Sequence, residues 1–145
     1  MERKYTILIA DRNPHVREFL RREMTAAGYR ILLADKGRDV VKRVYQHEPV
    51  DLLILDPDLP DVEESAVLKK IRNRIPALPV VVHTYVSDYE THQDLVNAAA
   101  FVEKRGSSIE NLREVVSEIL QECSVQPAVP PAHKKMPAGA QNETK

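Results

Sequence analysis

The chain has 145 residues, of which 43% are hydrophobic and 30% charged, a composition typical of one globular domain with a buried core. Its 21 basic and 22 acidic residues nearly cancel, so the net charge of −1 gives no electrostatic sign of binding to DNA or RNA. The single cysteine excludes an internal disulfide, and the first apolar run is too short for a signal peptide or a membrane span. We therefore expect a cytoplasmic protein with neither a membrane nor a nucleic-acid partner.

Short apolar runs alternate with helical patterns along the chain. The first run is followed by Asn13 and Pro14, a favourable cap and first residue for a helix whose apolar spacing ends at Gly28. The last helix opens with a capping box formed by Ser107 and Glu110. The predicted strands are residues 5–10, 30–33, 50–55, 79–83 and 101–102, with further helices around residues 40–45, 66–74 and 89–99.

This alternation predicts an α/β fold. Buried strands joined by helices indicate a doubly wound, five-stranded parallel sheet with helices on both faces, and the flavodoxin-like strand order 2-1-3-4-5 fits the size best. Residues 1–123 form this domain. Residues 124–145 contain four of the ten prolines and no apolar periodicity, so we expect a disordered C-terminal tail.

Polar residues follow the ends of four predicted strands. Asp11 and Asp56 follow the first and third strands, whereas Thr84 and Lys104 follow the fourth and fifth. Ligands of such sheets bind beyond the carboxyl ends of the strands, where the strand order reverses, so these side chains should converge. Two carboxylates beside a hydroxyl and an ammonium suit phosphoryl transfer, with one Asp as nucleophile and Mg²⁺ as the most plausible cation.

These residues lie in segments that resemble the receiver domain of two-component response regulators, over roughly residues 5–122. The matching segments are Ile7-Leu8-Ile9-Ala10-Asp11, Leu53-Ile54-Leu55-Asp56-x-x-Leu59-Pro60, Val80-Val81-Val82-His83-Thr84 and Phe101-Val102-Glu103-Lys104. The resemblance implies that Asp56 accepts a phosphoryl group from a histidine kinase or phosphotransfer protein. It also implies that Thr84 and Lys104 contact the phosphoryl oxygens.

The same resemblance assigns the metal and switch positions. Asp11, Asp56 and the backbone carbonyl of Asp58 would hold Mg²⁺, and Phe101 would be the switch aromatic. The chain departs from the family at Arg12, where a second acidic residue is usual, and at Tyr85, where a small residue is usual. Arg12 either lies at the surface or pairs with Asp56, where it would weaken Mg²⁺ binding. Tyr85 and Phe101 also have a simpler interpretation as packing residues.

A further departure from the family concerns the residue after Lys104. The family usually has a proline there in a cis bond, and this chain has Arg105. Because a cis bond before a non-proline residue costs ~3–4 kcal/mol, we expect a trans bond and a displaced Lys104.

Three functions are compatible with the sequence. The first is a stand-alone receiver that signals through contact with a protein partner, either as a monomer or as a homodimer. It has no enzymatic activity beyond self-phosphorylation and autodephosphorylation at Asp56. The second is a pseudo-receiver that interacts without phosphorylation, favoured by Arg12, Tyr85 and Arg105. The third is a phosphatase of the haloacid-dehalogenase type, suggested by Asp56-Pro57-Asp58, but it lacks the later acidic pair that such an enzyme needs.

Overall fold

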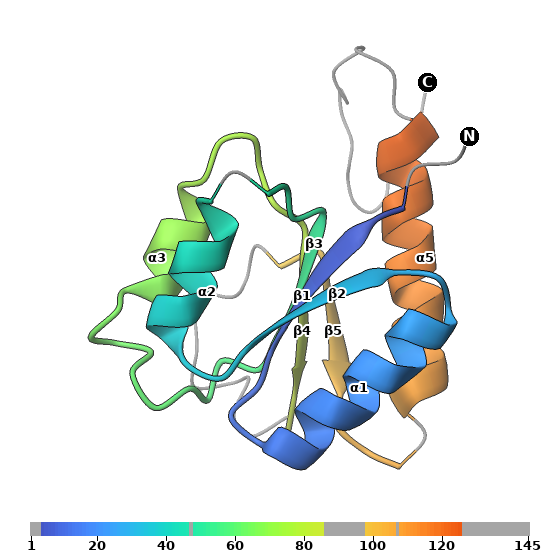
Figure 1. Cartoon of the computed structure of the whole chain (residues 1–145), viewed down its shortest axis with the longest axis horizontal. Helices are drawn as coiled ribbons and strands as arrows, with labels where there is room; N and C mark the ends of the chain where they lie inside the picture. Colours follow the sequence, from blue (N-terminus) through green and yellow to red (C-terminus); the bar gives the residue numbers. More distant parts are fainter. Residues whose placement is uncertain (1–3, 47, 86–97, 107, 126–145) are drawn as a thin grey trace.

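A five-stranded parallel sheet forms the centre of the computed structural model, which describes residues 4–46, 48–85, 98–106 and 108–125 (Figure 1). The strand order is β2-β1-β3-β4-β5, and all neighbouring strands are parallel, so the predicted fold class and order are confirmed. The strands are β1 (Thr6–Ala10), β2 (Arg30–Ala34), β3 (Leu52–Leu55), β4 (Val80–Thr84) and β5 (Ala100–Glu103).

Helices cover both faces of the sheet. In Figure 1, α1 and α5 lie on one side and α2 and α3 on the other. The helices are α1 (Pro14–Ala26), α2 (Gly37–Val44), α3 (Val67–Arg72) and α5 (Ser108–Val125). The helix expected at residues 89–99 falls almost entirely outside the described residues, and its last two residues, Ala98 and Ala99, are not helical.

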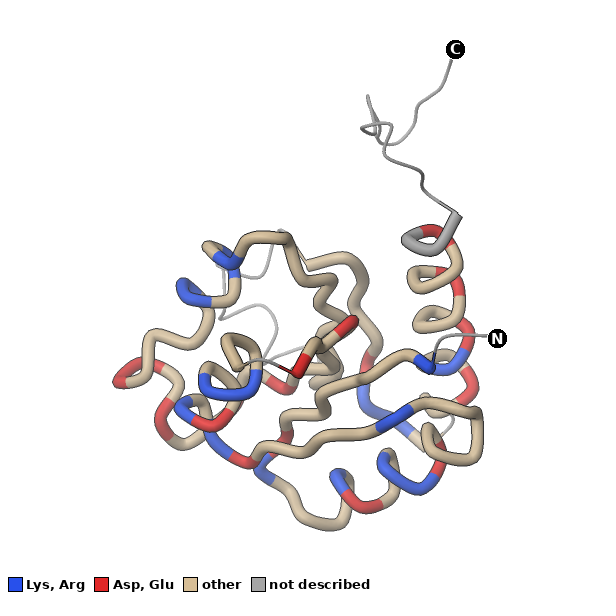
Figure 2. Tube along the Cα trace, turned by 45° about the horizontal axis from the view of Figure 1, so that its top comes forward, with Lys and Arg blue, Asp and Glu red and all other residues tan. Residues whose placement is uncertain are grey.

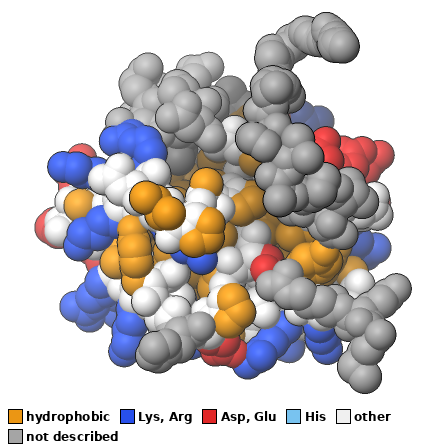
Figure 3. Space-filling view, turned by 90° about the horizontal axis from the view of Figure 1, so that it is seen from above, with side chains coloured by type: hydrophobic (Ala, Val, Ile, Leu, Met, Phe, Trp, Pro, Cys, Tyr) orange, Lys and Arg blue, Asp and Glu red, His pale blue; other side chains and the backbone are white. Residues whose placement is uncertain are grey.

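The strands are apolar on both faces because each face is covered. Ile7 and Ile9 pack with the cluster under α1 and α5, whereas Leu8 and Ala10 belong to the cluster under α2 and α3. Figure 2 shows the consequence for charge, since the strands are almost entirely uncharged and the charged residues lie on helices and loops. Viewed from above, Lys and Arg side chains gather on the side of α2 and α3 (Figure 3).

Local signals place the first helix as predicted. The Asn13 side chain accepts hydrogen bonds from the amides of His15 (2.9 Å) and Val16 (3.4 Å), and Pro14 is the first helical residue. Gly28 has a φ of 101°, which favours glycine just beyond the helix end.

The predicted boundaries needed small corrections. The third strand begins at Leu52 rather than at residue 50, because Val50 and Asp51 lead into the sheet without belonging to the strand. Helix α5 continues to Val125, two residues beyond the predicted domain boundary, and residues 126–145 lie outside the described part of the chain. Ser107 of the predicted capping box also lies outside it.

Candidate functional site

The four polar residues predicted from the strand ends meet at one edge of the sheet. Asp11 follows β1, Asp56 follows β3, Thr84 ends β4, and Lys104 follows β5. Asp11, Asp56 and Thr84 are 1%, 4% and 0% exposed, so these three side chains are shielded from bulk water. Buried carboxylates require compensating partners, and the site provides them.

Lys104 lies between the two carboxylates. Its Nζ is 2.8 Å from Asp11 Oδ2 and 2.5 Å from Asp56 Oδ2, and all three side chains are nearly buried. The expectation of a displaced Lys104 is therefore wrong, although its following peptide bond is trans, since the only cis bond among the described residues is Ile75–Pro76. The sheet explains this result, because the Lys104 amide donates to the Thr84 carbonyl at 2.9 Å and extends the β4–β5 pairing.

The remaining carboxylate oxygens accept hydrogen bonds from their surroundings. Asp56 Oδ1 accepts from the Asp58 amide at 2.9 Å and from Thr84 Oγ1 at 3.1 Å. Asp11 Oδ1 accepts from the Asn13 amide at 2.9 Å. Each carboxylate is thus oriented by a local turn on one oxygen, while its other oxygen faces the lysine.

Burial and charge shift the proton affinities of the site. Burial raises the pKa of Asp11 above its ordinary value, against the hydrogen bonds from Lys104 and the Asn13 amide. Burial also acts to lower the pKa of Lys104, but the Asp11 and Asp56 carboxylates outweigh it and raise that pKa. Two carboxylates against one ammonium leave this pocket with an excess of negative charge, which suits a further cation.

The donor set fits Mg²⁺. This ion takes oxygen ligands and is usually held by one or two carboxylates together with phosphate oxygens and water. Asp11 and Asp56 supply two carboxylates. Because no three His, Cys, Asp or Glu side chains form a metal-binding group among the described residues, water and phosphate oxygens would have to complete the coordination.

Arg12 does not pair with Asp56. Its Nη1 lies 3.7 Å from Asp58 Oδ1, and the two side chains are 55% and 57% exposed. The physical reason is that Asp56 is buried and already paired with Lys104, whereas Asp58 at the rim leaves the guanidinium in contact with water.

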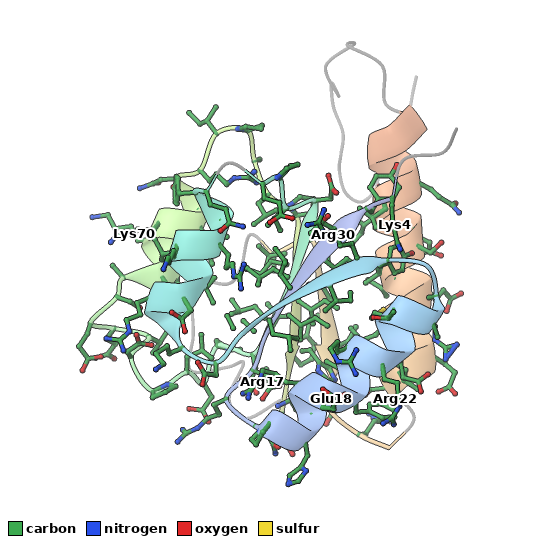
Figure 4. All side chains as sticks on the ribbon, viewed as in Figure 1. Lys4, Arg17, Glu18, Arg22, Arg30 and Lys70 are labelled. Carbon is green, nitrogen blue, oxygen red and sulfur yellow. The ribbon has the colours of Figure 1, made fainter. Side chains whose placement is uncertain are left out.

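Sequence reasoning missed a second arginine beside the site. Arg17 Nη1 donates to the Asp11 backbone carbonyl at 2.8 Å and so fastens the loop between β1 and α1. Figure 4 shows Arg17 on α1 near the edge where β1 ends, far from Lys4 and Arg30 at the opposite edge. Its spacing of six residues from Asp11, one helical turn after the cap, was the available signal.

The two aromatic residues have different environments. Tyr85 is 56% exposed, and Lys104 Nζ lies 5.5 Å from the centre of its ring, within range of a cation–π contact. Phe101 is partly buried against the cluster under α2 and α3. Phe101 therefore packs against the core, its role as a switch aromatic stays a prediction, and Tyr85 borders the site.

A buried histidine also lies next to the site, where no role was predicted for it. His83 precedes Thr84 on β4 and is 4% exposed, and its Nε2 lies 3.2 Å from Ser108 Oγ. Burial, with a smaller effect of the Lys104 charge, lowers the pKa of His83 to about 4. A histidine directly after the apolar run Val80–Val82 was the sequence signal for a polar group in the core.

The family follows from comparison with known proteins. The sequence model of the response regulator receiver domain matches residues 7–117. The chain belongs to the receiver domain family of two-component response regulators. This result also argues against the haloacid-dehalogenase alternative.

The relatives are longer regulators. The chain is 31% identical over 94 residues to response regulator RR06 of Streptococcus pneumoniae, covering 65% of this chain and 42% of RR06. It is 29% identical over 98 residues to the DNA-binding transcriptional regulator NtrC of Proteus hauseri, covering 68% of this chain and 20% of NtrC. The chain therefore spans between one fifth and about two fifths of these relatives.

Solved structures agree with the fold. Response regulator TrrA of Thermotoga maritima, crystallised with Mg²⁺ and BeF, has a TM-score of 0.70 and 28% identity over 79% of this chain and 98% of TrrA. A two-component response regulator from Clostridium difficile has a TM-score of 0.72 and 24% identity over 83% of this chain and 98% of that protein. Among the described helices, none has the length and apolar character needed to cross a lipid bilayer.

Proposed function

We propose that this receiver accepts a phosphoryl group on Asp56 and transmits the change through contact with a protein partner. The observation that carries the proposal is the position of Lys104 Nζ, within 2.8 Å of Asp11 and 2.5 Å of Asp56, beside the Thr84 hydroxyl. The donor would be the phosphohistidine of a histidine kinase or a phosphotransfer protein, as the family membership suggests.

The transfer uses the residues of this pocket. An Asp56 carboxylate oxygen attacks phosphorus, the P–O bond forms, and the P–N bond of the donor breaks with its electron pair passing to the imidazole nitrogen. Lys104 and Thr84 already contact Asp56, so they are placed to donate to the phosphoryl oxygens without large movement. Asp11, Asp56 and the Asp58 carbonyl would hold Mg²⁺, which would neutralise charge on the transferred group.

Intact mass spectrometry tests this proposal. Incubation with acetyl phosphate and Mg²⁺ should add the mass of one phosphoryl group to the protein, and Asp56→Asn should abolish the addition. Asp58→Asn is the matched control, because Asp58 is exposed and its amide, which Asp56 uses, is unchanged. Uptake that persists in Asp56→Asn would overturn the assignment of Asp56.

A pseudo-receiver is the second candidate, and one observation favours it. Arg12 and Asp58 form a pair at the rim, 3.7 Å apart, which places a fixed positive charge where an ordinary receiver has an acid. If the wild-type protein takes up no phosphoryl group while Arg12→Asp does, the chain acts through protein contact without phosphorylation.

A further inference from the structure

We propose that His83 is a positioning residue for Lys104, acting through Ser108 at the first position of α5. This inference rests on the proposed function, since it explains how the protein keeps the lysine at the phosphoacceptor. It concerns a contact on the opposite side of β4 from the pocket itself.

The contact between His83 and Ser108 is buried. The His83 side chain is 4% exposed, and its Nε2 lies 3.2 Å from Ser108 Oγ. Its Nδ1 has no hydrogen-bond partner in the described part of the chain, so within that part Ser108 is the hydrogen-bond partner of the ring. Losing that bond would leave the imidazole without a polar partner in the core, which makes the contact costly to break.

Two neighbouring residues of β4 contact the two ends of the segment that runs from Lys104 to Ser108. At one end, the Lys104 amide donates to the Thr84 carbonyl at 2.9 Å. At the other, Ser108 meets His83. Because consecutive strand residues point to opposite faces, His83 reaches α5 while the Thr84 hydroxyl reaches Asp56. The segment is therefore attached at both ends to one rigid strand.

Two bonds hold described residues of this segment: the Ser108 amide donates to the Arg105 carbonyl at 3.0 Å, and Arg105 Nη2 donates to Glu103 Oε1 at 2.6 Å. Arg105 and Gly106 are exposed, and no atom lies within 4 Å of the place a Gly106 Cβ would occupy. Arg105 also stands where a proline would restrict the backbone. The contact between Ser108 and His83 adds a restraint that ties the start of α5 to β4, and it limits how far Lys104 can withdraw from the carboxylates.

Nuclear magnetic resonance of the lysine ammonium groups tests the inference without phosphorylation. An ammonium held by two carboxylates exchanges its protons slowly and should give a visible ¹H–¹⁵N signal near neutral pH, assigned by its loss in Lys104→Arg. We expect Ser108→Ala to remove or broaden this signal. Ser117→Ala is the matched control, because its hydroxyl contacts Gln121 on the same helix and lies outside the segment.

Phosphoryl uptake from acetyl phosphate gives the second readout. We expect Ser108→Ala and His83→Leu to slow uptake roughly tenfold, because small displacements of a catalytic group reduce rates strongly. In a Lys104→Ala background Ser108→Ala should cause no further loss, since its effect passes through the lysine. Ser108→Thr, which keeps a hydroxyl, should restore the wild-type ammonium signal.

The outcomes separate the two proposals. An unchanged Lys104 signal in both Ser108→Ala and His83→Leu overturns the inference, whether or not the protein is phosphorylated. The inference is also overturned if Ser108→Ala slows phosphoryl uptake by the same factor in the wild-type protein and in the Lys104→Ala background. A wild-type protein that shows the ammonium signal and its loss in Ser108→Ala, but takes up no phosphoryl group, keeps the positioning role and removes the proposed function.

Discussion

Arg12 is the residue that most distinguishes this acidic pocket. Its guanidinium lies at the rim, 55% exposed and 3.7 Å from Asp58, rather than between Asp11 and Asp56. Even so, the chain carries a positive charge beside the carboxylates that we propose to hold Mg²⁺. Water screens this charge in part, because the side chain is half exposed.

The first prediction concerns Mg²⁺ affinity. Arg12→Asp removes a repulsive charge and adds a carboxylate at the rim, so we expect Mg²⁺ to bind at least about tenfold more tightly, which is ~1.4 kcal/mol. Titration of Mg²⁺ by calorimetry measures the change. Lys70→Asp on α3, which makes the same change of charge away from the site, is the control (Figure 4). Equal affinities for wild type and Arg12→Asp would contradict the prediction.

The second prediction concerns acid. The pKa of His83 is about 4 in the folded protein, mainly because the ring is buried, against 6.5 for an ordinary histidine. As the pH falls, His83 in the unfolded chain therefore binds a proton at a higher pH than His83 in the folded protein. The stability that the neutral ring contributes is complete above pH 6.5 and is lost as the pH falls towards 4, by roughly 3 kcal/mol over that window.

Chemical denaturation between pH 7 and pH 4 checks this dependence. His83→Leu should reduce the slope of unfolding free energy against pH by about one proton in this range. His15→Ala, on the exposed start of α1, is the comparison. The prediction fails if His83→Leu, like His15→Ala, has the same slope of unfolding free energy against pH as the wild-type protein.

At the scale of elements, the loop after β3 is tied to α2. The Asp61 carboxylate accepts from the Gly37 amide at 2.5 Å and the Arg38 amide at 3.1 Å, so it caps a helix that begins 24 residues earlier. The pKa of Asp61 is lowered because these amide bonds outweigh the effect of burial. Gly37 allows Ser65 to approach closely, since a Cβ on Gly37 would collide with Ser65 Oγ.

The third prediction concerns the start of α3. Ala66, the residue before this helix, has a φ of 53°, which costs a residue with a Cβ ~1–2 kcal/mol. Ala66→Gly should therefore stabilise the protein by about 0.5–1 kcal/mol after the added chain entropy is subtracted, visible as a higher thermal midpoint. Ala27→Gly, at a helical φ of −81°, should instead lower the midpoint. A lower midpoint for Ala66→Gly would show that the left-handed geometry is not strained.

At the scale of the whole molecule, the fourth prediction concerns residues 126–145. Their proline content and lack of apolar pattern indicate that they add no packed core. Truncation after Val125, where α5 ends, should leave the thermal midpoint nearly unchanged. A drop of several degrees in calorimetry would mean that this segment packs on the domain.

The fifth prediction is that phosphorylation changes the shape of this receiver only weakly. The Tyr85 ring lies beside Lys104, with 5.5 Å between Nζ and the ring centre, so it adds bulk where Thr84 would move. On addition of beryllium fluoride and Mg²⁺, we expect amide shifts to stay near Asp56, Thr84 and Lys104. In Tyr85→Ala, we expect the amide shifts to spread to residues farther from Asp56. A concerted shift across α5 in the wild type would contradict the prediction.

The sequence by itself determined the fold and the four polar residues at the strand ends. Continuous apolar runs such as residues 50–55, alternating with helical patterns, indicate strands of a parallel sheet that is covered on both faces. Parallel strands bring their carboxyl ends to one edge of the sheet. Asp11, Asp56, Thr84 and Lys104 could thus be named from their places in the chain, as could the cap at Asn13.

Only the tertiary structure decided how those residues are partnered. Arg12 turned to Asp58, Lys104 stayed in the pocket without a following proline, and Asp61 capped a helix far from it in sequence. Each result depends on contacts between segments that sequence spacing does not relate, and on which oxygens were already occupied. The contact between His83 and Ser108, 25 residues apart, is of the same kind, because it needs β4 and α5 to be packed together before it can form.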